Sequence, residues 1–263
     1  MARLVAIDKA MHAAHKWRRP DGFGFTIREA VVPIVALELG KVAPVMPTAF
    51  IGQHGHFELA AVLSAASGQN LFVAPDGRWL GGYVPSMFRT YPFRLAKPEG
   101  VEPPILCVDE SCVISADDAL PGELFFGADG EISASLKQII DFISAVERNR
   151  IATSIAVSSL AQAGVIKPWP ITIKSEQGER TVNGLNCIDE AALNALPTEE
   201  FIKLRSTGAL PIAYAQLLSM NQIGVFQHLA KLQTQLSPKP IAPLPDTLDK
   251  LFDASNNEYL RFD

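Results

Sequence analysis

The sequence of 263 residues lacks features that define several large classes of protein. No apolar run approaches the roughly 20 residues that a membrane-spanning helix needs. The apolar start of the chain is interrupted by Asp8 and Lys9, unlike a secretion signal. The net charge of −5 leaves no excess of positive charge for gripping nucleic acid. We therefore expect a soluble, cytoplasmic protein with no transmembrane segment and no nucleic acid partner.

Several catalytic and cofactor-binding motifs are also missing. Cys107, Cys112 and Cys187 are odd in number and have neither zinc nor thioredoxin spacing, so we expect reduced thiols. No serine lies in a Gly-x-Ser-x-Gly turn. Gly81-Gly82 lacks both the lysine of a phosphate-binding loop and the three-glycine pattern of dinucleotide-binding folds. No cofactor is therefore predicted.

The composition, with 48% hydrophobic and 19% charged residues, is typical of a globular protein with a substantial core. Residues 1–130 form a predicted β-rich region. Strands are expected at Arg3–Asp8, before Pro33, and within 103–115. A hairpin is expected with arms Thr48–Ile51 and Phe57–Leu63. The stretch 68–84 is expected to give a further strand followed by the turn Pro75-Asp76-Gly77.

Residues 131–236 form a predicted helical region. Apolar residues at helical spacing predict a helix over 135–164, capped by Ser133 or Ser135 and ended by Gly164. A hairpin is inserted at 169–188, turning at Gln177-Gly178, and helices capped by Asp189 and Thr198 follow it. The Pro-rich tail 237–263 is expected to be extended. The predicted fold class is α+β: a β-rich N-terminal half packed on a helical C-terminal half, with one continuous core.

Several long segments occur in an order that resembles one protein family. They are RLVAIDKAMHAAHKW, GQNLFVAPDGRWLGGYVPSMFRTYPF, LCVDE, LFFGADGEISASLKQIIDF and GLNCIDEAALNALPTEEFIKLRSTGALPIAYAQLLSM, within roughly residues 3–232. In these segments the chain resembles the SapC family of bacterial proteins. The resemblance implies a link by name with bacterial surface layers. It also implies a gene neighbourhood of flavin-dependent tryptophan halogenase-like enzymes and outer-membrane receptors, but no activity or catalytic residues.

The segment Gly77–Phe93 is rich in aromatic residues and arginine, which are enriched where proteins bind their partners. Pro85 suits the start of a short helix with Met87, Phe88 and Tyr91 near one face and Arg89 turned away. The candidate ligand-binding residues are Trp79, Tyr83, Phe88, Arg89 and Tyr91, together with Trp17 and Arg18. The alternative is that these aromatic side chains pack a corner of the core.

Two other groups are candidates for chemistry. His15 and the acidic pair Asp109-Glu110 could move protons. The structural alternative for His15 is a solvated helix end. For Asp109-Glu110 it is a loop that begins at the end of a strand. His54, His56 and Glu58 alternate along the chain and could hold a divalent metal ion, although solvated residues at a hairpin tip would have the same pattern.

The sequence therefore supports a ranking of functions. The leading hypothesis is a non-catalytic, cytoplasmic binding or accessory protein that recognises a peptide, an aromatic small molecule or a partner protein. The first alternative is an enzyme on a small or peptidic substrate, using His15 with Asp109 and Glu110, or a metal at His54, His56 and Glu58. The second alternative is a structural component of a surface layer. Self-association as a homo-oligomer stays open.

Overall fold

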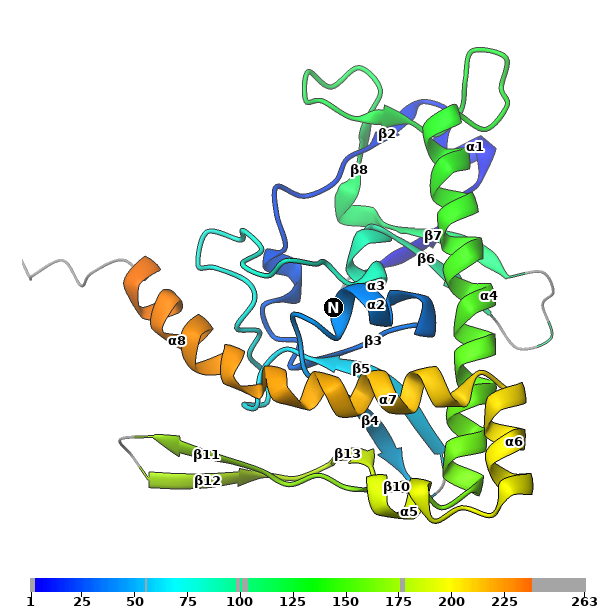
Figure 1. Cartoon of the computed structure of the whole chain (residues 1–263). Helices are drawn as coiled ribbons and strands as arrows, with labels where there is room; N and C mark the ends of the chain where they lie inside the picture. Colours follow the sequence, from blue (N-terminus) through cyan, green and yellow to red (C-terminus); the bar gives the residue numbers. More distant parts are fainter. Residues whose placement is uncertain (1–2, 55, 98–99, 101–103, 176–177, 238–263) are drawn as a thin grey trace, which may run out of the picture.

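The computed structural model describes residues 3–54, 56–97, 100, 104–175 and 178–237 (Figure 1). Strands dominate the first half of the chain and helices the second, which confirms the predicted α+β class. The predicted extended tail beyond residue 237 and the turn residue Gln177 lie outside the described residues. In the described part of the chain, no helix combines the length and the apolar character that crossing a membrane requires.

The largest sheet has five strands in the order β10-β13-β4-β5-β3, each antiparallel to its neighbours. The predicted hairpin is confirmed as β4 and β5, and Pro33 ends β3 because it has no N–H group to donate. β10 and β13 come from the second half of the chain, so both halves build this sheet. The bounds are Val31–Pro33 for β3, Thr48–Gln53 for β4, His56–Val62 for β5, Ile166–Pro168 for β10 and Leu185–Ile188 for β13.

Two three-stranded sheets, in the orders β1-β7-β6 and β8-β2-β9, lie toward the other end of the molecule (Figure 1). The strands predicted at the N-terminus and within 103–115 are confirmed there. β11 and β12 form the inserted hairpin, which projects from the body as a separate two-stranded ribbon. The bounds are Leu4–Ala6 for β1, His15–Trp17 for β2, Phe93–Ala96 for β6, Ile105–Asp109 for β7, Val113–Ser115 for β8, Glu123–Leu124 for β9, Ile171–Ser175 for β11 and Gly178–Val182 for β12.

Helix α4 (Ala134–Gln162) runs along one side of the molecule, from the small sheets to the main sheet (Figure 1). The Ser133 hydroxyl accepts a hydrogen bond from the Leu136 N–H, which confirms the predicted N-cap. Gly164 follows the helix with a φ of 69°, a left-handed conformation that favours glycine. The predicted helix over 135–164 is therefore confirmed to within two residues.

After β13, the described residues up to 237 continue as four α-helices and a 3-10 turn. Asp189 caps α5 as predicted, through a hydrogen bond from the Ala192 N–H. The cap predicted at Thr198 is wrong, because Thr198 is the first residue of α6 and Pro197 occupies the cap position without a side-chain hydrogen bond. The bounds are Glu190–Asn194 for α5, Thr198–Ser206 for α6, Ala209–Ser219 for α7, Met220–Gly224 for η4 and Val225–Leu236 for α8.

Short helices connect the strands of the first half and help to position the site described below. α3 lies within the aromatic segment Gly77–Phe93, whereas η2 and α2 link β3 to β4. The bounds are Lys9–His12 for α1, Gly24–Thr26 for η1, Ala36–Glu38 for η2, Leu39–Val42 for α2, Ser86–Arg89 for α3 and Glu110–Cys112 for η3.

The strand predicted within 68–84 is wrong. This stretch is a loop whose strand-like pairing is a single bridge between Val73 and Trp79. The predicted turn at Pro75-Asp76-Gly77 is present, and Gly77 has a φ of 86°. Two backbone hydrogen bonds flank the bridge, from the Ala74 N–H to the Arg78 carbonyl and from the Leu80 N–H to the Phe72 carbonyl, both at 2.8 Å.

Two clusters of buried apolar side chains make the core. The larger one packs the main sheet against the C-terminal half of α4, α6, α7 and α8, and it includes Phe50, Leu59, Leu160 and Ile212. The smaller one packs the two small sheets against the N-terminal half of α4 through Trp17, Phe93, Phe125 and Leu136. Helix α4 contributes to both clusters.

Candidate functional site

The aromatic residues of Gly77–Phe93 contact one another and the core. The Trp79 indole N–H donates to the Tyr83 carbonyl at 2.8 Å, and its ring stacks on Phe72 with centroids 5.5 Å apart. Phe88 is buried in the larger cluster. Arg89 was expected to turn away from the face of Met87, Phe88 and Tyr91, and its contacts are with other aromatic rings. Its guanidinium lies over the rings of Tyr83 and Phe142, at 5.3 and 5.0 Å from their centroids.

Glu38 of η2 organises this segment. Its carboxyl oxygens accept hydrogen bonds from the Ser86 N–H and hydroxyl, both at 2.7 Å, and from the Tyr83 hydroxyl at 2.9 Å. Arg89 in turn donates to the Tyr83 hydroxyl oxygen at 2.9 Å. Burial, followed by the charge of Glu38 and its hydrogen bond with Tyr83, raises the pKa of Tyr83 to about 12. This network fixes α3 onto η2.

Tyr91 belongs to a second network, beside the smaller cluster. Its hydroxyl donates to Asp109 at 2.8 Å, and its ring stacks on Phe25 with centroids 4.0 Å apart. Burial and the hydrogen bond with Asp109 raise the pKa of Tyr91. Burial acts to raise the pKa of Asp109, but the hydrogen bonds from Tyr91 and Ser111 outweigh it, so the pKa of Asp109 is lowered.

Trp17 lies away from Trp79, in the smaller cluster, where it meets Phe93 edge to face at 4.8 Å. Arg18 follows β2 and is half-buried. Of the seven aromatic and arginine candidates, Trp79, Tyr83 and Phe88 therefore belong with the larger cluster and Trp17 with the smaller one. Their role as one recognition surface stays a prediction.

The proton-transfer candidates are partly brought together. His15 and Glu110 line a cavity of about 300 Å³ that His12 also lines. The His12 and His15 rings are 6.2 Å apart, and His15 Nδ1 is buried without a hydrogen-bond partner among the described residues. Asp109, by contrast, is only 3% exposed and is occupied by Tyr91 and Ser111.

The three metal-binding candidates, His54, His56 and Glu58, lie in different elements near the tip of the β4–β5 hairpin. His54 lies in the turn with a φ of 56°, whereas His56 and Glu58 lie on β5. Among the residues that the structure describes, no three His, Cys, Asp or Glu side chains are grouped so that they could hold a metal ion. His56 and Glu58 instead line a cavity of about 500 Å³.

This cavity lies between α4 and the β4–β5 end of the main sheet, and we call it the α4 cavity. Its volume of about 500 Å³ lies within the range of small-molecule sites, about 300–1,000 Å³. Apolar walls come from the sheet, the β3–η2 connection, α3 and α4, and polar groups come from β5 and α4. The lining residues that matter here are Ile34, Val35, His56, Glu58, Leu59, Met87, Val146, Arg150, Thr153, Ser154, Val157 and Ser158.

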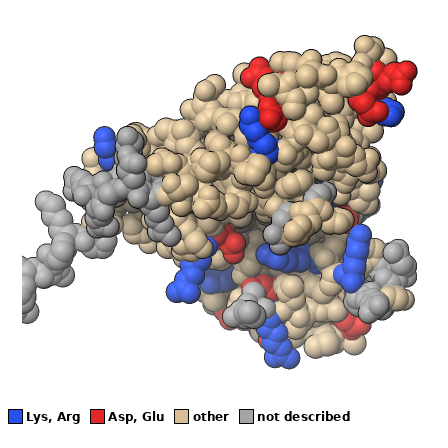
Figure 2. Space-filling view, turned by 90° about the horizontal axis from the view of Figure 1, so that it is seen from below, with Lys and Arg blue, Asp and Glu red and all other residues tan. Residues whose placement is uncertain are grey.

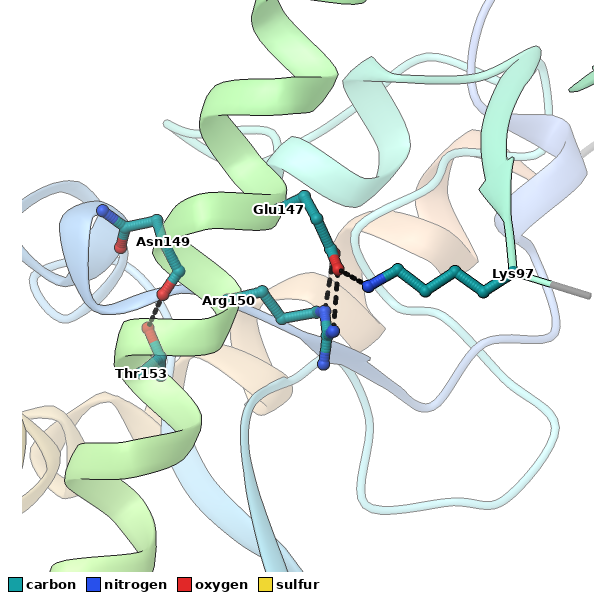
Figure 3. Close-up of polar contacts among 5 residues, drawn as sticks. All are labelled: Lys97, Glu147, Asn149, Arg150 and Thr153. Carbon is teal, nitrogen blue, oxygen red and sulfur yellow. Dashed lines mark hydrogen bonds and ion pairs between the residues drawn. The ribbon is translucent and has the colours of Figure 1, made fainter. Parts of the chain in front are cut away.

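Arg150 is the cation of the α4 cavity, and its neighbours hold it in place (Figure 3). Its Nε and Nη2 donate to the two carboxyl oxygens of Glu147 at 2.7 and 2.8 Å. Lys97 donates to the same carboxylate at 2.8 Å. The hydrogen bond from Arg150 is the largest cause that lowers the pKa of Glu147 to about 2. Glu147 is therefore ionised at neutral pH, and two positive charges share its one negative charge.

A guanidinium has five N–H donors, and Glu147 occupies two of those of Arg150. The remaining donors suit a carboxylate or phosphate, which arginine binds in a two-point geometry. The hydrogen bonds to Glu147 raise the pKa of Arg150, burial opposes them, and the charges of Glu147 and Glu58 add to the increase. Arg150 therefore stays charged and oriented without a ligand.

Thr153 closes one end of the α4 cavity by joining α4 to η2. Its hydroxyl donates to the Asn149 carbonyl at 2.7 Å and accepts from the Ala36 N–H at 2.8 Å. Asn149 Oδ1 accepts from the Leu37 N–H. The first N–H groups of η2 are thus satisfied by side chains of α4, and the arrangement fixes the wall formed by Ile34 and Val35.

Ser154 and Ser158 form the mouth of the α4 cavity on the same stripe of α4 as Arg150, at intervals of four residues. Both are exposed, and neither hydroxyl has a hydrogen-bond partner among the described residues. Figure 2 shows the molecule from below. The surface there is hollowed, and Lys and Arg side chains lie around the hollow with a few Asp and Glu side chains.

Sequence reasoning missed Arg150, Ser154 and Ser158. The apolar residues predict the helix over 135–164, but their spacing carries no information about a site on its polar face. The usable signal was the spacing of an arginine and two serines at four-residue intervals, since such residues share one face of a helix.

The fold and the α4 cavity define an α+β protein with an amphipathic cavity between a long helix and an antiparallel sheet. The SapC family model matches residues 7–225, and the chain belongs to the SapC family. This confirms the resemblance noted in the sequence. Neither a curated protein nor a solved structure matches the chain.

Proposed function

We propose that this chain is a non-catalytic, cytoplasmic binding protein whose α4 cavity holds a peptide or a small molecule with an apolar body and an acidic group. The observation that carries the proposal is Arg150, which lines the cavity and is oriented by a carboxylate that Lys97 also neutralises. An anionic group that binds Arg150 would face one net positive charge from Lys97, Arg150 and Glu147 together, with the Glu58 carboxylate on the opposite, strand wall.

The walls support an apolar ligand body, an aromatic ring included. Leu59, Val146, Val157 and Met87 line the cavity, and Met87 comes from the aromatic segment that the sequence singled out. A flexible thioether adapts to ligands of different shape and packs well against rings. The three cysteines are unpaired and buried, which is compatible with a reducing compartment.

The test is titration with 3-phenylpropionate, an aromatic carboxylate, followed by backbone amide shifts and calorimetry. We expect shifts in α4 from residue 146 to residue 158 and in β5. Arg150→Ala should weaken binding at least tenfold, because a charge-assisted hydrogen bond contributes about 1.5–3 kcal/mol. Ser154→Trp should block the mouth of the cavity. Arg148→Ala, on the same helix and outside the cavity, is the matched control and should bind like the wild type.

Two results would count against the proposal. Equal affinity in the wild type and Arg150→Ala would exclude Arg150 as the anchor. Shifts confined to Trp79, Tyr83 and their neighbours would return the site to the aromatic segment. An accessory role beside flavin-dependent tryptophan halogenase-like enzymes, or at a surface layer, would extend this proposal, and both rest on the family resemblance alone.

An acid–base enzyme is the second candidate. The observation that favours it is the smaller cavity, where His15, His12 and Glu110 lie together. Glu110, however, forms an ion pair with Arg3 at 3.1 Å. A screen of p-nitrophenyl ester hydrolysis should then give a rate that His15→Asn abolishes and that His228→Asn, an exposed histidine on α8, leaves unchanged.

A further inference from the structure

We infer that the ligand of the α4 cavity carries an amino group as well as an acidic group, so that it is an amino acid or a short peptide with a bulky apolar side chain. This inference rests on the proposed function. It adds a second charged contact, on the strand wall of the cavity.

Glu58 supplies the second contact. It lies on β5 opposite Ile51 of β4, and because it is two residues from His56, the two side chains share one face of the sheet. Glu58 is exposed and lines the α4 cavity. The cavity thus has a carboxylate on its strand wall and a guanidinium on its helix wall.

These two charges are near each other without pairing. The charge of Glu58 adds to the raised pKa of Arg150, yet within the described part of the chain Arg150 forms its ion pair with Glu147. Since Arg150 is held by Glu147, it cannot collapse onto Glu58 without losing two short hydrogen bonds. A space between opposite charges suits a molecule that bridges them with charges of its own.

A zwitterion would give both Arg150 on the helix wall and Glu58 on the strand wall a partner of opposite charge. Its carboxylate would accept from the free N–H groups of Arg150, and its ammonium would donate to Glu58, a group with acceptor atoms only when ionised. Ser154 and Ser158 offer hydroxyls along the helix wall, which can both donate to and accept from a peptide amide. The apolar side chain would lie against Val146, Val157 and Met87.

The opposite charges also provide selectivity. A ligand that has a carboxylate and no amino group would leave Glu58 beside a buried apolar body without a partner. A ligand whose amino group is acylated would place a neutral amide against Glu58. Both should bind less tightly than the free amino acid, because neither gains the attraction between an ammonium group and the Glu58 carboxylate.

The test compares L-phenylalanine, N-acetyl-L-phenylalanine and 3-phenylpropionate by calorimetry on the full chain. We expect L-phenylalanine to bind at least tenfold more tightly than the other two. Glu58→Gln should remove that preference, by weakening L-phenylalanine about tenfold while leaving 3-phenylpropionate within twofold. Glu199→Gln, an exposed acid on α6, is the matched control, and Arg150→Ala should weaken all three ligands.

The outcomes separate this inference from the proposed function. If L-phenylalanine gains nothing over 3-phenylpropionate, or Glu58→Gln leaves both unchanged while Arg150→Ala weakens both, the inference is wrong and the binding function stands. If none of the three ligands binds to the wild type, the proposed function fails and this inference fails with it.

Discussion

Glu38 shows how a single buried residue can account for an aromatic segment that resembles a binding surface. It is 5% exposed, and its carboxyl oxygens accept four hydrogen bonds, from Val35, Tyr83 and twice from Ser86. The groups that it satisfies would otherwise be buried donors without partners. The Tyr83 hydroxyl oxygen in turn accepts a hydrogen bond from Arg89. The polar atoms of this segment therefore hold η2, the loop that carries Tyr83, and α3 together.

Replacing Glu38 should consequently be among the most destabilising changes in the first half of the chain. We expect Glu38→Ala to lower the free energy of unfolding by about 3 kcal/mol, because several buried donors lose their acceptor at about 1–3 kcal/mol each. Tyr83→Phe removes one link and should cost about 1 kcal/mol. Urea unfolding measures both, with the exposed Glu29→Ala as control. Equal stability of Glu38→Ala and the wild type would show that water replaces the lost acceptor.

At the scale of the element, α4 consists of three successive segments with different contacts. Leu136, Ile139 and Ile143 enter the smaller cluster, and Ala156, Val157 and Leu160 enter the larger one. Between these segments, Glu147 and Arg150 form a pair at i and i+3 that supports the α4 cavity. Because the helix is fixed at both ends by packing, the geometry of this middle turn is rigid without a ligand.

The ion pair between Glu147 and Arg150 predicts that the free energy of unfolding depends on pH. The hydrogen bond from Arg150 is the main cause that lowers the pKa of Glu147 from 4.5 to about 2 in the folded protein. A lowered pKa means that the contribution to stability is complete above about pH 4.5 and is lost as the pH falls toward 2. We therefore expect Glu147→Gln to be less stable than the wild type at neutral pH, by a difference that shrinks below pH 4.5.

Chemical unfolding at a series of pH values measures this difference. Asp141→Asn, which changes an exposed acid on the same helix, is the control and should give no such trend. A difference between Glu147→Gln and the wild type that is as large near pH 3 as at pH 7 would contradict the assigned ion pair.

At the scale of the whole molecule, the sequence predicted what neighbouring residues determine. The Ser133 cap, the end at Gly164 and the β4–β5 hairpin depend on local signals, and each was found. The pairing of β13 with β4, where Leu185 lies opposite Ile51, joins residues 134 positions apart, and no local pattern encodes it. The α4 cavity is of the same kind, since its walls are brought together by tertiary packing.

The arrangement of the core predicts how the molecule unfolds. The two clusters are separate sets of buried residues, but α4 contributes to both, so loss of either should weaken the helix that the other needs. We propose that the two clusters unfold as one cooperative unit. Leu136→Ala in the smaller cluster and Leu160→Ala in the larger one should each cost about 3 kcal/mol, as Leu→Ala changes in well-packed cores do.

Native-state hydrogen exchange at Val108 of β7 and Leu59 of β5 reports on the two clusters separately. If the two clusters unfold as one cooperative unit, Leu136→Ala should accelerate exchange at both positions by the same factor. Leu160→Ala should do the same. Ile151→Ala, at an exposed position of α4, should change neither. If Leu136→Ala accelerates exchange at Val108 alone, α4 does not couple the clusters. The α4 cavity would then belong to a larger unit that folds without the small sheets.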